Sequence, residues 1–483
     1  MRKATLAVAL TLLIDFSSPG RVMMTLPSLG LKISIAQDRQ SPRSVVIKGA
    51  TLIDVHTGGQ LNDSEIVIEG DLITQVGRAS AITTPKDAQV IDGRNKWIIP
   101  GLMDMHAHVS GLDASSLVLF IANGVTTIRD PGGNLSRLRL VRQEIDSGER
   151  VAPRLFLAGY VLDGNPPLWP ALSIVVETPE RAESVVNSQI DQGVDLIKVY
   201  NSITEPVLAA IVLAAHKRGV PVIGHVPRSM TMTRVAEMGI DGLEHIRITG
   251  RELLTLEEAN RIDFLPLAQR EALLWQRYDL GSDKMKRLIS FLAEKKVSLD
   301  PTLTIDQINS LSLFEQQSND PNNRFLPRHT RAAWSGPKPD VFKVPSELKE
   351  VSQAGFKKRM QFVEMCSRAG VQIIAGTDGA GLGKLLPGFG LQHELQLLSQ
   401  AGLSPVQVVQ AATINAARAL RKEKDLGSIE SGKLADLVIL NSNPLVDIRN
   451  MSAIHAVITR GRVLDRKTLD EILTQAETES RKN

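Results

Sequence analysis

The sequence has a single cysteine, Cys366, among its 483 residues. One thiol cannot form an internal disulfide, and it excludes a zinc site built from several cysteines. Aromatic residues make up 4% of the chain, the net charge is +3, and no basic run carries interleaved aromatic residues. We therefore expect no nucleic-acid partner.

Long hydrophobic runs are also scarce. The apolar stretch 4–14 follows Arg2 and Lys3 and ends at Asp15, so it is too short to span a bilayer stably. A charged start followed by a short apolar segment is typical of a secretory signal. We expect residues 1–40 to be a signal peptide or a disordered extension, with cleavage after Ala36. The mature protein would then have no stable membrane span and would be exported to the periplasm or outside the cell; without a real signal it would be cytoplasmic.

Two β-rich segments bracket the chain. Residues 41–100 and 426–468 both consist of short runs of alternating hydrophobicity broken by Gly, Asn and Asp. The economical interpretation is one small β-sandwich built from both ends of the chain, followed by a C-terminal tail, 469–483.

The middle of the chain, residues 101–425, alternates predicted strands with helical patterns, which is typical of a (β/α)8 TIM barrel. Insertions are expected at about 250–296 and 305–350, and the second could cover the mouth of the barrel. The predicted strands are Ile99–Met105, Val125–Arg129, Arg154–Ala158, Asp195–Val199, Val220–Gly224, Gly242–His245, Val297–Pro301 and Gln372–Thr377.

His106 and His108 end the apolar run that begins at Trp97. Residues i and i+2 of a strand share a face, so these two imidazoles can bind one metal ion together. Four more polar residues lie at or near the ends of later predicted strands, where a barrel would gather them at one mouth: Lys198, His225, His245 and Asp378. Four imidazoles and a carboxylate suit zinc or a similar borderline metal.

Lys198 is the unusual member, because a protonated ammonium repels metal ions. A buried lysine between metals loses its proton readily, and a neutral amine can add carbon dioxide to become a carbamate. The residues alone do not establish this reaction.

With these positions in order, the sequence resembles the amidohydrolase superfamily. The matching motifs are the H-x-H of PGLMDMHAH, the Lys of LIKVY, the His of IGHVP, the His of LEH and the Asp of AGTDG, together with NGVTTIRD and AATINAARAL…LGSIESGKLADLVIL. The resemblance covers about residues 45–465. Within the superfamily, the sequence is similar to the imidazolonepropionase-like and metal-dependent prolidase branches. Lys198 favours their binuclear type, since imidazolonepropionases proper use one metal and lack this lysine.

The resemblance implies a cofactor of two divalent metal ions, with zinc favoured, and carbamylation of Lys198 by CO2. His106 and His108, helped by Asp378, would bind the more buried ion, and His225 and His245 the more exposed one. The carbamate and a hydroxide would bridge both ions, and the hydroxide would attack the substrate. Asp378 would be the catalytic proton carrier, taking the hydroxide's proton and passing it to the leaving amine.

Three further residues are weaker candidates. Tyr200, two positions past Lys198, could bind a substrate carbonyl or carboxylate. Arg129 could clamp a substrate carboxylate, although a structural ion pair with Asp130 or another acid is the simpler interpretation. His393 could support a ligand by hydrogen bonding from outside the metal shell.

We therefore predict a hydrolase of carbon–nitrogen bonds in small amides, such as dipeptides or N-acyl amino acids. Cyclic amides such as hydantoins or lactams are the alternative substrates, and a non-catalytic metal-binding homologue is the alternative from another class. A homo-oligomer is possible, but no residue pattern indicates one.

Overall fold

The computed structural model describes residues 44–334, 336, 340–379 and 385–482. The predicted signal segment 1–40 and the cleavage position after Ala36 lie outside these residues. Within the described part of the chain, no helix is long and apolar enough to cross a membrane.

The middle of the chain forms a barrel of parallel strands. Three strands pair in the order β6-β7-β8 and seven in the order β10-β9-β11-β12-β13-β14-β15. The two sheets meet where Met105 N donates to Ala375 O at 2.9 Å and Asp195 N donates to Leu157 O at 2.8 Å. The strands are β6 (Leu102–Asp104), β7 (Val125–Asp130), β8 (Arg154–Leu157), β9 (Val161–Asp163), β10 (Ser173–Val175), β11 (Ile197–Val199), β12 (Val222–Gly224), β13 (Gly242–Glu244), β14 (Ser298–Asp300) and β15 (Gln372–Ile373). The predicted TIM barrel is confirmed, and β9 and β10 are additions to the eight predicted strands.

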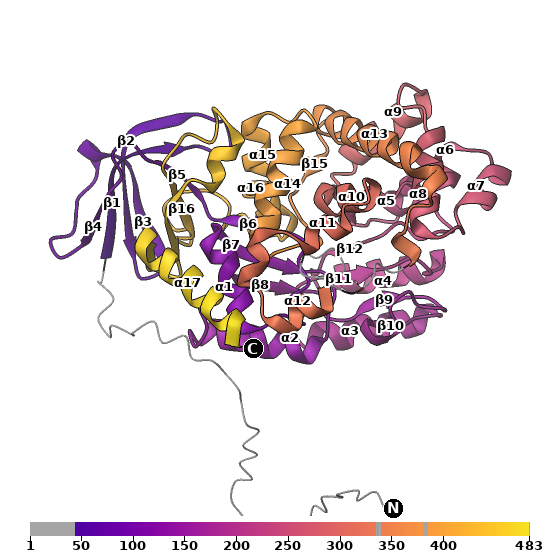
Figure 1. Cartoon of the computed structure of the whole chain (residues 1–483), viewed down its shortest axis with the longest axis horizontal. Helices are drawn as coiled ribbons and strands as arrows, with labels where there is room; N and C mark the ends of the chain where they lie inside the picture. Colours follow the sequence, from indigo (N-terminus) through magenta and orange to yellow (C-terminus); the bar gives the residue numbers. More distant parts are fainter. Residues whose placement is uncertain (1–43, 335, 337–339, 380–384, 483) are drawn as a thin grey trace, which may run out of the picture. The chain divides into compact units, whose positions relative to one another are not determined.

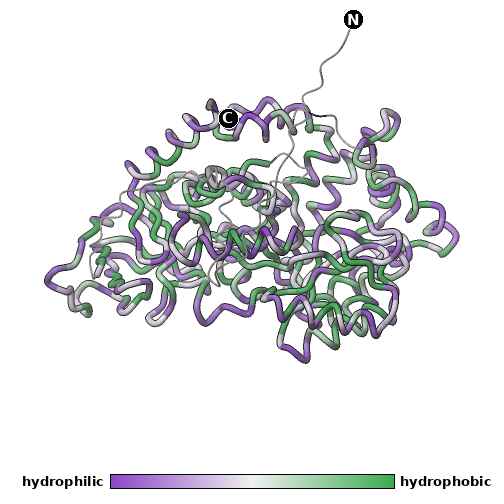
Figure 2. The backbone as a smooth tube through the Cα atoms, turned by 90° about the horizontal axis from the view of Figure 1, so that it is seen from below, coloured by the Kyte–Doolittle hydropathy of each residue, from purple (hydrophilic) through white to green (hydrophobic). Residues whose placement is uncertain are grey.

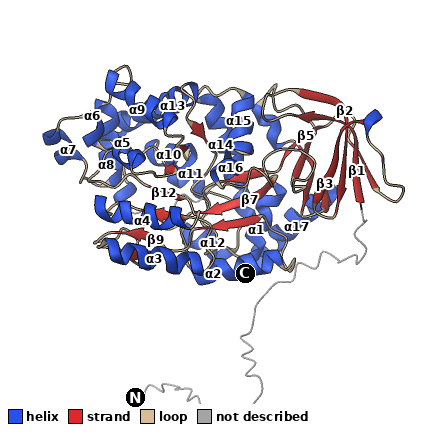
Figure 3. Cartoon of the chain, turned by 180° about the vertical axis from the view of Figure 1, so that it is seen from behind, coloured by secondary structure: helices blue, strands red, loops and turns tan. Residues whose placement is uncertain are grey.

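Helices surround these strands in Figure 3. In Figure 2 hydrophilic and hydrophobic residues alternate along the helix that leads to the C-terminus, as expected for a helix with one buried face. The helices are α1 (Ala114–Ala122), α2 (Leu135–Asp146), α3 (Pro179–Asp191), α4 (Glu205–Lys217), α5 (Met232–Glu237), α6 (Gly250–Leu253), α7 (Leu256–Ile262), α8 (Leu267–Arg277), α9 (Asp283–Glu294), α10 (Leu303–Ser310), α11 (Phe314–Ser318), α12 (Arg328–Trp334), α13 (Lys349–Arg368), α14 (Phe389–Gln400), α15 (Pro405–Ala411), α16 (Ile414–Ala419) and α17 (Arg466–Lys482).

The strands at the two ends of the chain share one eight-stranded sheet, in which the early and late segments lie side by side (Figure 1). Its order is β18-β17-β16-β5-β1-β2-β3, and β4 also pairs with β1. One apolar core joins residues from both ends of the chain, including Ile47, Ile66, Leu437 and Ile458. The strands are β1 (Ser44–Ile53), β2 (Gln60–Glu69), β3 (Leu72–Arg78), β4 (Gln89–Asp92), β5 (Trp97–Pro100), β16 (Leu437–Leu440), β17 (Ile454–Thr459) and β18 (Arg462–Asp465). The predicted β-sandwich made from both termini is therefore present.

The predicted strand Ile99–Met105 is wrong in one respect, because the chain divides it between the two sheets at Gly101. Strand β5 pairs antiparallel with β16, whereas β6 pairs parallel with β7. A Cβ on Gly101 would lie 2.0 Å from Thr126 Oγ1, so only glycine fits where the chain crosses into the barrel.

Both predicted insertions are helical. The first carries α6 to α9, and the second carries α10 to α12 with the start of α13. The predicted tail 469–483 lies almost entirely in α17, which contacts the 3-10 turn Pro321–Phe325 of the second insertion. Arg331 donates to Ser480 O at 3.2 Å, so the last helix is tied to that insertion.

Candidate metal centre

One cavity, the metal cavity, collects all six predicted ligands. It encloses about 1410 Å³, including its open mouth. The six ligands in its lining are His106, His108, Lys198, His225, His245 and Asp378.

Each ligand is positioned by a barrel strand. Lys198 lies within β11, and His225 and His245 directly follow β12 and β13. Parallel pairing sets Val199 beside Gly224, which brings the ends of β11 and β12 level. The first and last strands meet through the pairing of Ala107 with Gly379, next to His106, His108 and Asp378.

The side chains are in direct reach of one another. The ring centroid of His106 lies 5.3 Å from that of His108 and 4.9 Å from that of His245, which in turn lies 5.0 Å from that of His225. Asp378 Oδ1 lies 3.2 Å from His108 Nε2 and 3.6 Å from His106 Nε2. Ligand atoms of His106, His245 and Asp378 all fall within 4.8 Å of one another, a spacing suited to a shared metal ion.

The Nδ1 atom of every ligand imidazole has an oxygen close by. His108 Nδ1 lies 2.8 Å from Gly132 O, His225 Nδ1 lies 2.9 Å from Asn201 Oδ1, and His245 Nδ1 lies 2.6 Å from Thr302 Oγ1. In the fourth ring, His106 Nδ1 lies 2.7 Å from Glu244 Oε2. Where a ring donates from Nδ1 to such an oxygen, its Nε2 keeps the lone pair that a metal ion needs.

The chemistry of this donor set fits bound metal. His225 Nε2 is buried, and no described residue makes a hydrogen bond with it. Burying a polar nitrogen without a partner costs free energy, which a metal ion in the cavity would offset. Imidazole nitrogens and a carboxylate are the ligands that zinc prefers.

Burial determines the protonation of several ligands. It lowers the pKa of His106, His225 and His245 well below the usual range, so these rings are neutral and able to coordinate. Burial also lowers the pKa of Lys198, to about 8, which makes the free amine accessible near neutral pH. Burial raises the pKa of Asp378, but the nearby imidazoles His106 and His108 lower it by more.

His245 and Asp378 adopt left-handed backbone conformations, with φ of 61° and 55°. Residues other than glycine rarely adopt them, and they persist only where the surroundings hold them. His245 is held by its N–H, which donates to Asp300 O at 2.7 Å. The turn directs the ring from the end of β13 into the metal cavity.

Arg129 lies beneath the ligands and does not line the metal cavity. It is 1% exposed and donates to both oxygens of Glu244, at 2.8 and 2.9 Å, and to Asp300 at 3.2 Å. Glu244 also lies 3.8 Å from Lys198 Nζ. Glu244 and Asp300 were not predicted from the sequence, although each is the last residue of a barrel strand, which was the available signal.

Tyr200 does line the metal cavity. Its ring centroid lies 4.0 Å from that of His225, and its hydroxyl accepts a hydrogen bond from Trp169 Nε1 at 3.0 Å. Burial raises the pKa of Tyr200, so the hydroxyl keeps its proton. His393 Nε2, in contrast, lies 2.8 Å from Gln307 Oε1, and within the described part of the chain His393 makes no hydrogen bond or ion pair with the six candidate ligands.

The remaining lining was not predicted residue by residue. Leu267, Arg270, Ile305, Asn309, Phe314 and Phe342 come from the two insertions, and Leu168, Trp169 and Leu172 come from the segment between β9 and β10. Arg247 lies two residues past His245.

Comparisons with known proteins agree with this architecture. The Amidohydrolase family model matches residues 284–464. An adenine deaminase of Mesorhizobium japonicum is 21% identical over 439 residues, which are 90% of this chain and 59% of the relative. The chain therefore spans about three fifths of that curated relative's length.

Two solved structures share the fold. A bottromycin amidohydrolase has a TM-score of 0.73 at 23% identity, covering 91% of each chain. A Xaa-Pro dipeptidase with methionine bound in its active site has a TM-score of 0.63 at 23% identity, covering 87% of this chain and 100% of that one.

Proposed function

Because this chain is related to the amidohydrolase family in sequence and in fold, we propose that it is a metal-dependent hydrolase of carbon–nitrogen bonds. Its substrates are small amides such as dipeptides or N-acyl amino acids. The observation that carries the proposal is the convergence of six candidate ligands on one cavity. Each of the four imidazoles has Nδ1 beside an oxygen, and Nε2 of His225 has no hydrogen-bond partner among the described residues.

His106, His108 and Asp378 would hold one divalent metal ion, and His225 and His245 would hold a second. Lys198, carbamylated by CO2, would be a further ligand between the two positions. Zinc is the favoured metal because the donors are mainly imidazoles. When bound, the ions activate water for attack and polarise the scissile carbonyl.

Asp378 moves the proton in this reaction. Its lowered pKa keeps the carboxylate ionised at neutral pH, so it can accept a proton from the attacking water. It then delivers that proton to the nitrogen of the leaving amine. Its side chain is 27% exposed, the most accessible of the carboxylates that surround His106.

Tyr200 orients the substrate. Its oxygen already accepts the hydrogen bond from Trp169, so its own proton is free to donate to a carbonyl or carboxylate oxygen of the substrate. Its closeness to His225 places that donor beside the second metal position.

Heteroaromatic amines and cyclic amides are two further substrate classes to be assayed. The adenine deaminase relatives favour hydrolysis of an exocyclic C–N bond on a heteroaromatic ring, and Trp169, Phe314 and Phe342 offer aromatic surfaces for such a ring. Cyclic amides use the same attack on a carbonyl.

The test is metal analysis of the purified protein combined with a panel of dipeptides, N-acyl amino acids, hydantoins and adenine. We expect close to two metal ions per chain and turnover of linear amides. Metal-loaded protein that hydrolyses none of these compounds would overturn the enzyme assignment. Turnover of adenine or hydantoins alone would replace the substrate class.

Lys198→Ala tests the bridging role. We expect loss of one or both metal ions and a fall in activity of about 100-fold or more, with partial rescue by short carboxylic acids that replace the carbamate. Lys217→Ala, on the outer helix α4, is the matched control. Normal metal content in the Lys198→Ala variant would contradict the bridging role of Lys198.

A further inference from the structure

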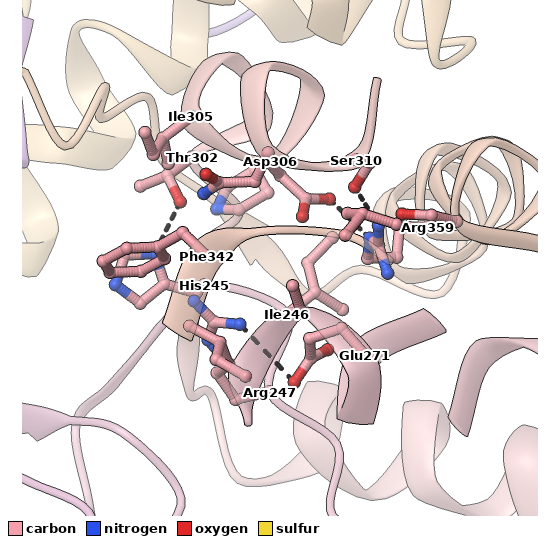
Figure 4. A pocket seen from close by; sticks show the side chains of 16 residues that line it. His245, Ile246, Arg247, Glu271, Thr302, Ile305, Asp306, Ser310, Phe342 and Arg359 are labelled. Carbon is pink, nitrogen blue, oxygen red and sulfur yellow. Dashed lines mark hydrogen bonds and ion pairs between the residues drawn. The ribbon is translucent and has the colours of Figure 1, made fainter. Parts of the chain in front are cut away.

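A second pocket, the side pocket, opens beside the metal cavity. It measures about 490 Å³ including its opening to solvent, and six of its lining residues also line the metal cavity. The shared residues are His245, Arg247, Leu267, Ile305, Asn309 and Phe342. Asp306, Ser310 and Arg359 line the side pocket only, and in Figure 4 they lie at the end away from His245. The two pockets therefore adjoin, with these six residues between them.

Arg359, which lines the side pocket, has one hydrogen-bond donor without a partner among the described residues. The residue is 2% exposed, and its Nε donates to Asp306 Oδ2 at 2.5 Å while Nη2 donates to Ser310 (Figure 4). Its Nη1 is buried, and no described residue accepts a hydrogen bond from it. A buried guanidinium nitrogen without an acceptor is costly, so an oxygen supplied by a ligand would be favourable here.

Arg247 supplies a second guanidinium where the two pockets join. Its Nη1 lies 3.4 Å from Glu271 Oε1 (Figure 4). The same Glu271 oxygen accepts from Arg270 Nη2 at 3.1 Å. Arg270 lines the metal cavity and not the side pocket. Glu271 thus serves Arg247 and Arg270, and Asp306 serves Arg359, so the three guanidinium groups around the two pockets carry one positive charge in excess of these carboxylate partners. That excess favours an anionic ligand over a neutral one.

The rest of the metal cavity is suited to an apolar group. Its lining includes Val161, Leu168, Leu172, Phe314 and Phe342. The cavity therefore offers metal ligands at its base, apolar contacts on one side and guanidinium donors on another. An amide that carries a carboxylate near the scissile bond and an apolar group elsewhere would satisfy all three.

We propose that the side pocket is a subsite for a carboxylate of the substrate, with Arg247 and Arg359 as its specificity-determining residues. This inference rests on the proposed function. It restricts the substrates to amides with a free carboxylate on the side of His245. Glu271 and Asp306 are positioning residues, which hold the two guanidinium groups in place.

The first test measures binding without hydrolysis. Isocaproate and 4-methyl-1-pentanol have the same carbon skeleton and no C–N bond, so titration calorimetry of the metal-loaded protein reports recognition of the carboxylate alone. We expect isocaproate to bind more tightly than the alcohol. Arg247→Gln should weaken isocaproate binding roughly 10- to 100-fold, the loss of one charge-assisted pair, and leave the alcohol unchanged.

Two further variants refine the first test. Arg359→Lys keeps the charge beside Asp306 but removes the Nη1 donor, and it should also weaken isocaproate binding. Arg277→Gln, at an exposed position of the helix α8 that carries Glu271, should bind isocaproate like the unaltered protein. If Arg359→Lys fails to fold, Arg247 decides the outcome, because its side chain is 20% exposed and tolerates substitution.

Unchanged isocaproate binding in Arg247→Gln would overturn the subsite, since the carboxylate would then be held by the metal ions alone. Hydrolysis gives a second readout: with a dipeptide and its C-terminal amide, Arg247→Gln should raise KM only for the free acid. Loss of activity on both substrates alike would also overturn it. If the protein binds isocaproate through Arg247 but hydrolyses no C–N bond, the proposed function is wrong and the carboxylate subsite is still supported.

Discussion

The base of the metal cavity and its wall are built in different ways. The base consists of the six candidate ligands at barrel strand ends, with Arg129, Glu244 and Asp300 packed beneath them. The wall consists of side chains from α8, α10 and the turn Asp340–Phe342. Ligand geometry at the base is fixed by strand pairing and buried charge pairs, whereas the wall is held by side-chain contacts between helices. Substitutions at the base should therefore affect folding and metal content, and substitutions in the wall should affect only substrate affinity.

The largest expected effect is on stability. Arg129→Met removes the cation that pairs with both Glu244 and Asp300, and it leaves two buried carboxylates without their partner. Breaking a buried pair in this way costs about 3–5 kcal/mol. Denaturant unfolding should show that loss, and Arg137→Met, at an exposed position of α2, should show almost none. Equal stability of the two variants would contradict the contrast between base and wall.

Asn201→Ala tests the hydrogen bonds that orient the ligands. Removing the oxygen 2.9 Å from His225 Nδ1 leaves the ring free to turn and to change tautomer. We expect metal affinity to fall roughly 10- to 100-fold in competition with a chelator, while the fold is retained. Asn187→Ala, on α3 and outside the cavity lining, is the control. Unaltered metal affinity would show that strand geometry alone positions His225.

Phe342→Ala tests whether a substitution in the wall changes substrate affinity alone. Phe342 lines both pockets and contributes no metal ligand, so its loss removes only apolar contact with the substrate. KM should rise by about 3- to 10-fold, with kcat and metal content unchanged. A fall in metal content would mean that the wall and the base are coupled, and the comparison above would fail.

The smallest effect is expected far from the cavity, at Glu430. A hydrogen bond from Ser428 is the main cause that lowers the pKa of Glu430 to about 2. Because the folded-state pKa lies below the unfolded value, its stabilising effect is complete above about pH 4.5 and is lost as the pH falls toward 2. The side chain is 51% exposed, so screening by water keeps the effect small. Glu430→Gln should lower Tm by roughly 1 °C at pH 7 and by less at pH 3.5; a larger loss at pH 3.5 would refute the sign.

The barrel, and the gathering of the six candidate ligands at one cavity, could be predicted from sequence because strand ends are marked locally. His225 and His245 each follow an apolar run that ends in a turn, and parallel strands bring such positions to one mouth wherever the loops run. Glu244 was not predicted because, in the sequence, a carboxylate next to a histidine looks like an ordinary surface charge. Only its position at the end of β13 shows that its side chain is buried.

The side pocket could not be predicted, for the opposite reason. Arg359 is in the middle of the long helix α13 and meets Asp306 of α10 across 53 positions of sequence. No local periodicity encodes which helix faces lie together, and the two insertions, 250–296 and 305–350, had no strand pattern to fix their register. Arg129 shows the same limit, since its partners lie 115 and 171 positions away.

Strand β5 has a consequence for how the chain acquires its structure. Its neighbours are β1, which precedes it closely, and β16, whose Leu437 pairs with Pro100 across more than three hundred positions. Pairings of such separation form slowly, because a long loop must close before they gain any stability. Only Gly101 separates β5 from β6, so this late closure also anchors the backbone that leads to His106 and His108. We therefore expect the refolding protein to become able to bind metal only in one of the last steps of refolding.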